Sequence, residues 1–102
     1  MKDSGIVNIH GKQYQTVAYR VGKFREAYGS TLCLRTEIVD RSEDVVVMRA
    51  AIATPEGVVL ATGHSEEYRK SSQINKTSAL ENAETSAIGR ALAAFGIGGT
   101  EF

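Results

Sequence analysis

The spacing of apolar residues changes along this chain from helical to alternating and back to helical, and these changes predict the order of its elements. Apolar residues recur at helical spacing over residues 16–28, which predicts a helix. Gly29 suits the end of that helix. We expect Arg20, Lys23 and Glu26 to lie off the apolar stripe. The stripe consists of Val17, Tyr19 or Val21, Phe24 and Tyr28.

Three strands joined by short polar turns are predicted after this helix. The middle strand is a nearly continuous apolar run broken only by Arg49, so we expect it to be the best covered of the three. Consecutive strands with short turns favour an antiparallel meander. The strands are predicted over residues 31–39, 45–54 and 58–66, with turns at residues 40–44 and 54–57 and a preceding hairpin over residues 5–14 that turns at residues 10–12.

A helix built from small residues is predicted next, starting at Asn75 or Ser78 and ending at Gly96. Ser78 and Glu81 have the spacing of a capping box. Its many alanines allow close approach to a sheet, and Gly89 costs about 1 kcal/mol relative to alanine. Gly89 therefore indicates either a close backbone contact or a tolerated defect. The stripe expected to face the sheet is Leu80, Ala83, Glu84, Ala87, Ile88, Ala91, Leu92 and Phe95.

Together these elements predict an α+β fold. A three-stranded antiparallel meander, with an N-terminal hairpin and a preceding helix, packs against a long C-terminal helix. A chain of 102 residues corresponds to one domain, here residues 1–102. No opening apolar run and no stretch of membrane-spanning length occurs, so we expect a soluble, cytoplasmic protein.

Charge and cysteine content narrow the functional classes. Twelve basic and twelve acidic residues balance, which is unlike a strongly basic nucleic-acid binder, although a basic stripe on one face remains compatible with neutrality. The single cysteine, Cys33, permits no intrachain disulfide and is read as a core or sheet residue.

No residue cluster in the sequence suggests catalysis. Neither His10 nor His64 has neighbouring ligands at metal spacing, and we interpret His64 as a polar residue at a strand end. Alternation should send Glu66 and Glu67 to opposite faces of a strand. The glycines of residues 96–99 neither follow a strand nor open a helix, unlike a phosphate-binding loop. We expect no enzymatic activity, no metal and no cofactor.

Basic residues gather around the long helix. Arg69 and Lys70 precede it and Lys76 lies in its first turn, where helix N-terminal amides favour anions. This segment is read either as a phosphate site, with Ser71, Ser72, Gln73 and Asn75 adding donors, or as an ordinary solvated loop. Both interpretations stay open at this point.

Two further groups are candidates for contacts with nucleic acid. Arg90 points away from the apolar stripe, as a phosphate contact or half of a salt bridge, and Arg20 with Lys23 forms a second basic cluster. Tyrosines can stack bases, or they can be half-buried core residues. The tyrosines concerned are Tyr19, Tyr28 and Tyr68.

Three segments of the chain resemble the single-strand annealing proteins of the Rad fifty-two superfamily, including its phage members. Residues 79–96 are similar to the long helix of that family, with Arg90-Ala91-Leu92 and Phe95-Gly96 at matching places. Residues 11–29 resemble the helix before the sheet. Residues 45–64, with Pro55-Glu56-Gly57, resemble the hairpin that leads to the long helix.

This resemblance implies a DNA-binding and oligomerisation domain that anneals single-stranded DNA to its complement in homologous recombination and repair. Rings or helical assemblies would hold the strand by its backbone without ATP, in a bacterial cytoplasm if the source is a phage. An exonuclease or a single-strand-binding protein would be a helper. The resemblance assigns Arg90 to the basic groove, the region of Arg69, Lys70 and Lys76 to the basic loop, and Arg20 to the first helix.

The chain departs from the family at Gly89 and Ala93, where members carry further basic residues. We therefore expect few phosphate contacts per protomer, multiplied over many protomers, and steep salt dependence. The alternative is an oligomeric protein-interaction module of the same fold that does not anneal DNA. Neutral net charge favours that alternative.

Overall fold

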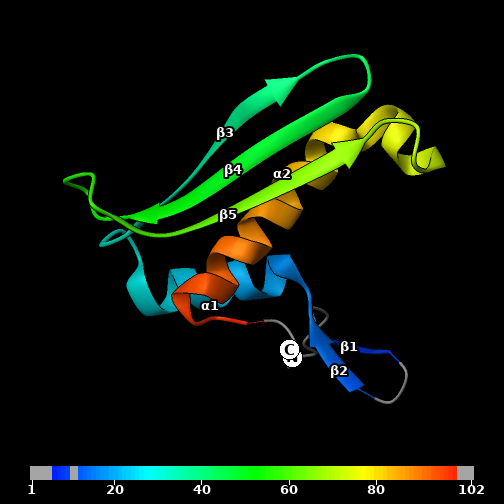
Figure 1. Ribbon diagram of the computed structural model, residues 1–102. Coiled ribbons are helices and arrows are strands. Elements are labelled where there is room, and N and C mark those ends of the chain that lie inside the picture. The colour runs from blue at the N-terminus through cyan, green and yellow to red at the C-terminus, as the bar shows by residue number, and fades with distance from the viewer. Residues whose placement is uncertain (1–5, 10–11, 99–102) are drawn as a thin grey trace.

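The computed structural model describes residues 6–9 and 12–98, and it shows the predicted α+β arrangement (Figure 1). The predicted turn at His10 and Gly11 and the tail from Gly99 lie outside the described residues. The elements in chain order are β1 (Ile6–Ile9), β2 (Lys12–Gln15), α1 (Val17–Tyr28), β3 (Cys33–Arg41), β4 (Val45–Ala53), β5 (Val59–Tyr68) and α2 (Gln73–Phe95).

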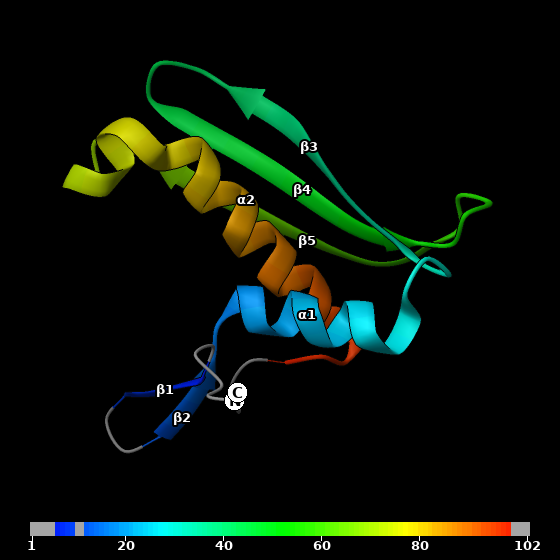
Figure 2. The same cartoon turned by 180° about the vertical axis from the view of Figure 1, so that it is seen from behind.

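Strands β3, β4 and β5 form one antiparallel sheet in that order, as the predicted meander requires. Strands β1 and β2 form the predicted hairpin as a separate two-stranded sheet. Helix α2 crosses one face of the larger sheet, and α1 lies against the C-terminal half of α2 (Figure 2). No element lies over the other face of the sheet among the described residues (Figure 1).

The ends of α1 and the turn between β4 and β5 follow from local sequence chemistry. Thr16 caps α1, because its side chain accepts a hydrogen bond of 3.2 Å from the Tyr19 amide. Gly29 ends the helix with a φ of 54°, a backbone conformation that glycine adopts without cost. The Gly57 amide donates to the Thr54 carbonyl at 2.9 Å, which closes the predicted β-turn.

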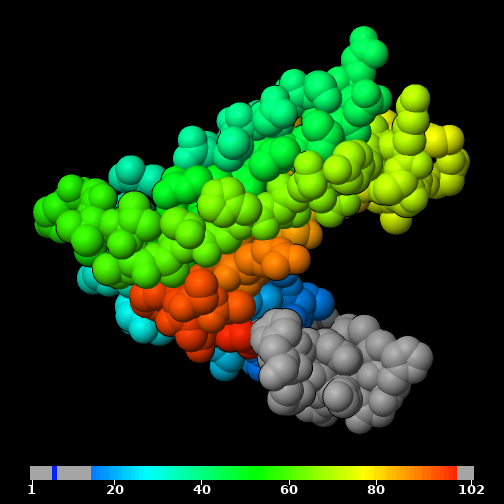
Figure 3. Space-filling model, viewed as in Figure 1, coloured from blue at the N-terminus to red at the C-terminus, as the bar shows by residue number. Residues whose placement is uncertain are grey.

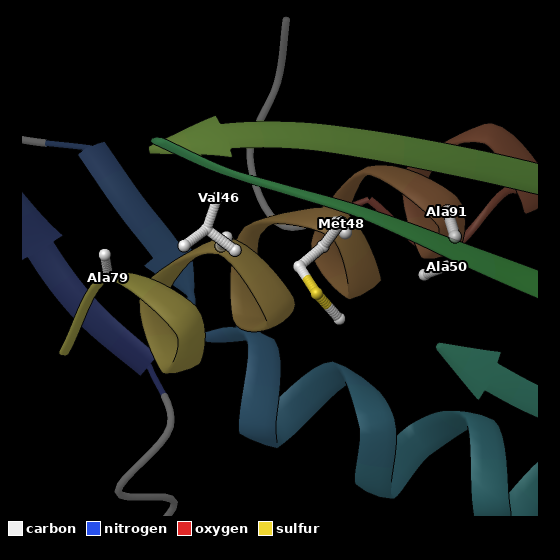
Figure 4. Close-up of a cluster of buried hydrophobic side chains, with 7 residues drawn as sticks. Val46, Met48, Ala50, Ala79 and Ala91 are labelled. Atoms are coloured by element: carbon white, nitrogen blue, oxygen red, sulfur yellow. The ribbon is translucent and has the colours of Figure 1, made fainter. Parts of the chain in front are cut away.

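The core forms where alternate residues of β4 meet the alanine stripe of α2. Val46 and Ala50 are fully buried and Met48 is nearly so (Figure 4). They pack against Ala79, Ala83, Ala87 and Ala91, which are also fully buried. This arrangement confirms both the predicted face of the long helix and the prediction that β4 is the best-covered strand.

Helix α2 comes closest to the sheet at Gly63 on β5. A Cβ atom placed on Gly63 would collide with the Ala91 amide nitrogen, would lie 2.5 Å from the Ala87 carbonyl oxygen and would lie 2.7 Å from the Arg90 Cβ. Two of these three neighbours are backbone atoms that cannot move aside. Glycine at this position is therefore a condition for the helix–sheet packing.

Several predicted boundaries need correction. Strand β3 continues through Asp40 and Arg41, which were assigned to the turn, and a bulge between Ile38 and Asp40 lets the strand run on. Helix α2 begins earlier than predicted, because Ser72 caps it by accepting a 3.0 Å bond from the Asn75 amide. The predicted start at Ser78 is instead a kink with a φ of −130° inside the helix.

The uncovered face of the sheet carries charged residues, two of which form an ion pair. Arg49 on β4 forms an ion pair of 2.8 Å with Glu37 on β3, and His64 lies opposite Arg49 on β5. His64 is exposed in the interior of the strand, so its predicted place at a strand end is wrong, whereas its polar sheet role holds. Neither helix of the described residues combines the length and the apolar sequence that crossing a bilayer requires.

Candidate nucleic-acid interface

Two hollows lie along the face of α2 that points away from the sheet. In the space-filling view, the surface is indented between the start of α2 and the start of α1 (Figure 3). The two hollows share Ser86, so they adjoin each other on α2. From residue 82 onward, the residues of α2 that line them recur at helical spacing and are small or polar: Asn82, Thr85, Ser86, Gly89, Arg90 and Ala93. Ile74 and Asn75, nearer the start of α2, also line the second hollow.

The first hollow, which we name the arginine hollow, lies between α1 and α2 and has a volume of about 530 Å³. Arg90 is exposed, as its predicted direction away from the apolar stripe requires. No carboxylate lines the hollow, and the one ion pair among the described residues is that of Arg49 and Glu37 elsewhere. The lining residues are Val17, Arg20, Ser86, Gly89, Arg90 and Ala93.

Arg20 is buried, with 6% of its surface exposed, so the prediction that it lies off the buried stripe of α1 is wrong. Its Nε donates to the Ile97 carbonyl at 3.0 Å. Its Nη2 donates to the carbonyls of Gly89 at 2.6 Å and Ile97 at 2.9 Å. These carbonyls belong to the last turns of α2 and the residue after its cap, where the helix dipole favours a cation.

The remaining nitrogen of Arg20, Nη1, takes part in none of these bonds, and Arg20 is one of the residues that line the arginine hollow. Burial lowers the pKa of Arg20, because desolvation penalises the charged guanidinium. Arg20 is therefore a fixed cation that is held by backbone carbonyls and has no carboxylate counter-ion among the residues lining the hollow. An anion in the hollow would supply that counter-charge.

Gly89 keeps the arginine hollow open. A Cβ atom on this residue would lie 2.9 Å from Val17 Cγ2 and 3.4 Å from Arg20 Nη1. Of the two interpretations of this mid-helix glycine, close contact is the correct one. The contact is with side chains of α1.

The second hollow, which we name the amide hollow, lies beside the N-terminal part of α2 and has a volume of about 460 Å³. One of its lining residues is Asn75, which is 3% exposed. The Asn75 side chain joins the end of β5, the loop that follows it and the next turns of α2. The lining residues are Glu67, Ser71, Ser72, Ile74, Asn75, Asn82, Thr85 and Ser86.

Two of the four polar residues that are candidate phosphate donors before α2, Ser71 and Asn75, use their donors within the protein. Asn75 Nδ2 donates to Glu67 Oε1 at 2.8 Å, to the Tyr68 carbonyl at 3.0 Å and to Ser71 Oγ at 2.8 Å. The Ser71 hydroxyl donates to the Tyr68 carbonyl at 2.9 Å. These bonds hold the kinked start of α2 on β5, so Asn75 and Ser71 are structural.

The structure brings two of the six predicted basic residues together, Arg20 and Arg90 in the arginine hollow. Arg69 faces the turn between β3 and β4, where its Nε donates to the Ser42 carbonyl at 3.1 Å. Lys70 and Lys76 are exposed near the start of α2, and neither lines the arginine hollow or the amide hollow. Lys23 is exposed on α1, with its ammonium 5.4 Å from the centre of the Tyr19 ring.

None of the three candidate tyrosines lies in the fully buried core. Tyr28 packs at the end of α1, with its ring centre 5.4 Å from that of Phe24 and 5.3 Å from that of Phe95. This packing supports the half-buried interpretation of Tyr28. Tyr68 at the end of β5 is 55% exposed.

Comparison with known proteins identifies the family of the chain. A family model described as "Slr1353 N-terminal dsRNA-binding domain-like" matches residues 21–95, so the chain belongs to that family. The match runs from within α1 to the end of α2 and therefore includes the whole meander and most of both hollows. No curated protein matches the chain, and no solved structure matches it.

Proposed function

We propose that this protein binds single-stranded DNA along the outward face of α2 and, as an oligomer, anneals complementary strands without ATP. The observation that carries the proposal is the arginine hollow. Two arginines line it, one buried and one exposed, and no carboxylate does. The planar guanidinium group of arginine binds the phosphate groups of nucleic acids through paired hydrogen bonds.

The two arginines suit different parts of one task. The carbonyls of Gly89 and Ile97 hold Arg20 in place, so its Nη1 can donate a hydrogen bond to a phosphate oxygen with little loss of side-chain entropy. Arg90 is exposed and can close over the same strand. Phosphate contacts position a strand without reading its sequence, and the bases of a strand held by its backbone stay available for pairing.

Two likenesses support the proposal at different levels. The family description, with its likeness to a double-stranded-RNA-binding domain, supports a nucleic-acid-binding or interaction module. The resemblance to the annealing proteins of the Rad fifty-two superfamily supports the finer assignment to single-stranded DNA. In this proposal the partners are the complementary strand, further copies of the chain, and a helper such as an exonuclease or a single-strand-binding protein.

Assembly belongs to the proposal because one protomer carries little free positive charge. The chain is neutral overall, and two arginines per protomer bind weakly alone. Many such sites on one assembly act together through their high effective concentration. Strands β3 and β5 are the two edges of the larger sheet, and unpaired edges are places where another chain can add a strand.

A second candidate is an oligomeric interaction module without a role in annealing. The observation that favours it is a run of three apolar residues at the start of edge strand β5. Val58, Val59 and Leu60 are 59%, 48% and 47% exposed. Contiguous exposed apolar residues mark surfaces that bind other proteins.

The deciding experiment measures annealing of two complementary fluorescent oligonucleotides at low and physiological salt, without ATP, together with the mass of the protein assemblies. We expect salt-sensitive acceleration by an oligomer. Arg90→Ala should remove most of it, and Arg35→Ala, which removes an exposed arginine of β3 outside both hollows, should not. Oligomers that bind no strand would refute the proposal and favour the interaction module.

A further inference from the structure

The amide hollow has a chemistry that phosphate binding does not explain. Its lining contains hydroxyls, two amides and the carboxylate of Glu67, and it contains no lysine or arginine. A phosphate beside Glu67 would meet repulsion rather than attraction. The hollow instead suits a neutral ligand group that can donate a hydrogen bond.

The hydrogen-bond network fixes which atom of Asn82 is available to such a group. The Asn75 amide nitrogen must face Glu67 and the Tyr68 carbonyl, because both are acceptors only. Asn75 Oδ1 is therefore the acceptor for Asn82, whose Nδ2 donates to it at 2.7 Å. The orientation of the Asn82 amide follows from this bond, with its nitrogen directed to Asn75.

Asn82 Oδ1 is thus left as a pre-oriented acceptor. The side chain of Asn82 is half-buried and lines the amide hollow. Asn82 Oδ1 makes none of the hydrogen bonds found among the described residues. Every buried side-chain oxygen among those residues has a hydrogen-bond partner, so Asn82 Oδ1, which has none, must be exposed to solvent. The hydroxyls of Thr85 and Ser86 lie on the same face of α2.

We infer that the amide hollow receives a ribose 2′-hydroxyl of a strand whose phosphates lie in the arginine hollow, so that the protein binds RNA more tightly than DNA. This inference rests on the phosphate contacts of the proposed function, and it makes RNA rather than DNA the strand that binds more tightly. The two hollows share Ser86, and Asn82 precedes Arg90 by eight positions, or about 12 Å along the helix axis. A strand that follows the outward face of α2 therefore passes both.

The 2′-hydroxyl fits this place because it both donates and accepts hydrogen bonds, and it is the group that distinguishes RNA from DNA. It can donate to Asn82 Oδ1 and accept from a neighbouring hydroxyl of α2. A DNA strand leaves Asn82 Oδ1 to water. One such contact per protomer is repeated along an assembly, which enlarges the difference between the two strands.

The test uses the unaltered protein and three oligonucleotides of one sequence that carry 2′-hydroxyl, 2′-hydrogen or 2′-fluoro sugars. The 2′-fluoro strand keeps an RNA-like sugar shape but cannot donate. We expect the 2′-hydroxyl strand to bind about three- to tenfold more tightly than the other two, as one or more added hydrogen bonds would give. Equal binding of all three strands, or 2′-fluoro binding equal to RNA, would overturn the inference and leave the proposed function intact.

Variants locate the effect. Asn82→Ala should remove the RNA preference, whereas Arg90→Ala should weaken RNA and DNA by a similar factor and preserve the ratio between them. Because Asn82→Ala also leaves Asn75 Oδ1 without its donor, thermal unfolding is measured alongside. The oligonucleotide series decides the question even if that variant unfolds. Failure of every strand to bind would overturn the proposed function itself.

Discussion

Helix α2 meets the sheet and α1 in two different ways, and one glycine marks each contact. At Gly63 the backbone of β5 touches the backbone of α2, so the atoms in the way of a Cβ include the Ala91 amide and the Ala87 carbonyl. At Gly89 the helix meets side-chain atoms of Val17 and Arg20. Side chains can move by small rotations, whereas a backbone in a helix cannot.

The contact between α2 and the sheet fixes the fold, whereas the contact between α2 and α1 forms the candidate binding site. The helix–sheet contact is apolar, buried and rich in alanine, and it sets where α2 lies. The contact between α1 and α2 includes a charged side chain and a hollow of about 530 Å³. Substitutions at the first contact should change stability most, and substitutions at the second should change binding most.

Gly63→Ala should have the largest effect on stability. Its Cβ would overlap backbone atoms of α2, so the helix must move away from β5 and loosen the alanine core. Overpacking of this kind costs about 3 kcal/mol. Urea denaturation followed by circular dichroism measures it, and an unchanged midpoint would contradict the close approach of β5 and α2.

Arg20→Met should rank second. Methionine retains much of the apolar stem but leaves the carbonyls of Gly89 and Ile97 without their donor, which costs about 2 kcal/mol. Arg20→Lys is the matched control, because it keeps the charge and loses the planar fork. We expect the lysine variant to be intermediate in stability. A methionine variant as stable as the parent protein would show that the arginine is not structural.

Gly89→Ala should change stability by less than about 1 kcal/mol, because alanine is the better helix former and offsets part of the contact with Val17. Its methyl group would narrow the arginine hollow near Arg20 Nη1. We therefore expect weaker binding of single-stranded nucleic acid with a nearly unchanged unfolding midpoint. A drop in stability as large as that of Gly63→Ala would erase the distinction between the two contacts.

Arg90→Ala should have the smallest effect on stability, within about 0.5 kcal/mol, because the side chain is exposed. Its effect should appear in the salt dependence of binding. Loss of one phosphate contact lowers the slope of log affinity against log salt concentration by about 1. Fluorescence anisotropy with a labelled oligonucleotide at several salt concentrations measures that slope.

The element order and the buried face of α2 could be predicted because both follow from periodicity. The alanines of α2 recur on one side of the helix, and four of them are fully buried against β4. The meander followed from short polar turns between apolar segments. These are local signals, and tertiary packing agreed with them.

Arg20 was misplaced because residue type was given more weight than position. It lies three residues after Val17 and four before Phe24, which is the spacing of one helix face. That position was the available signal for its burial. Its partners, Gly89 and Ile97, come from the other end of the chain, so no local pattern shows that its charge would be satisfied.

Asn75 was misread for a related reason. A polar residue in a serine-rich loop before a helix resembles a ligand donor. Its burial depends on the path by which β5 turns back onto α2, where Glu67 and Tyr68 meet it. The local sequence showed that donors were present, and the fold determined that they face inward.

The link between Arg20 and Ile97 has a consequence for the protein during its synthesis. The two residues are 77 positions apart, so the arginine hollow takes shape only after Ile97 has left the ribosome and α2 has docked. A chain that is still being translated presents an arginine whose acceptors do not yet exist. In the proposed function, the phosphate site is therefore complete only when the whole domain has folded, so that binding of a strand reports completed folding.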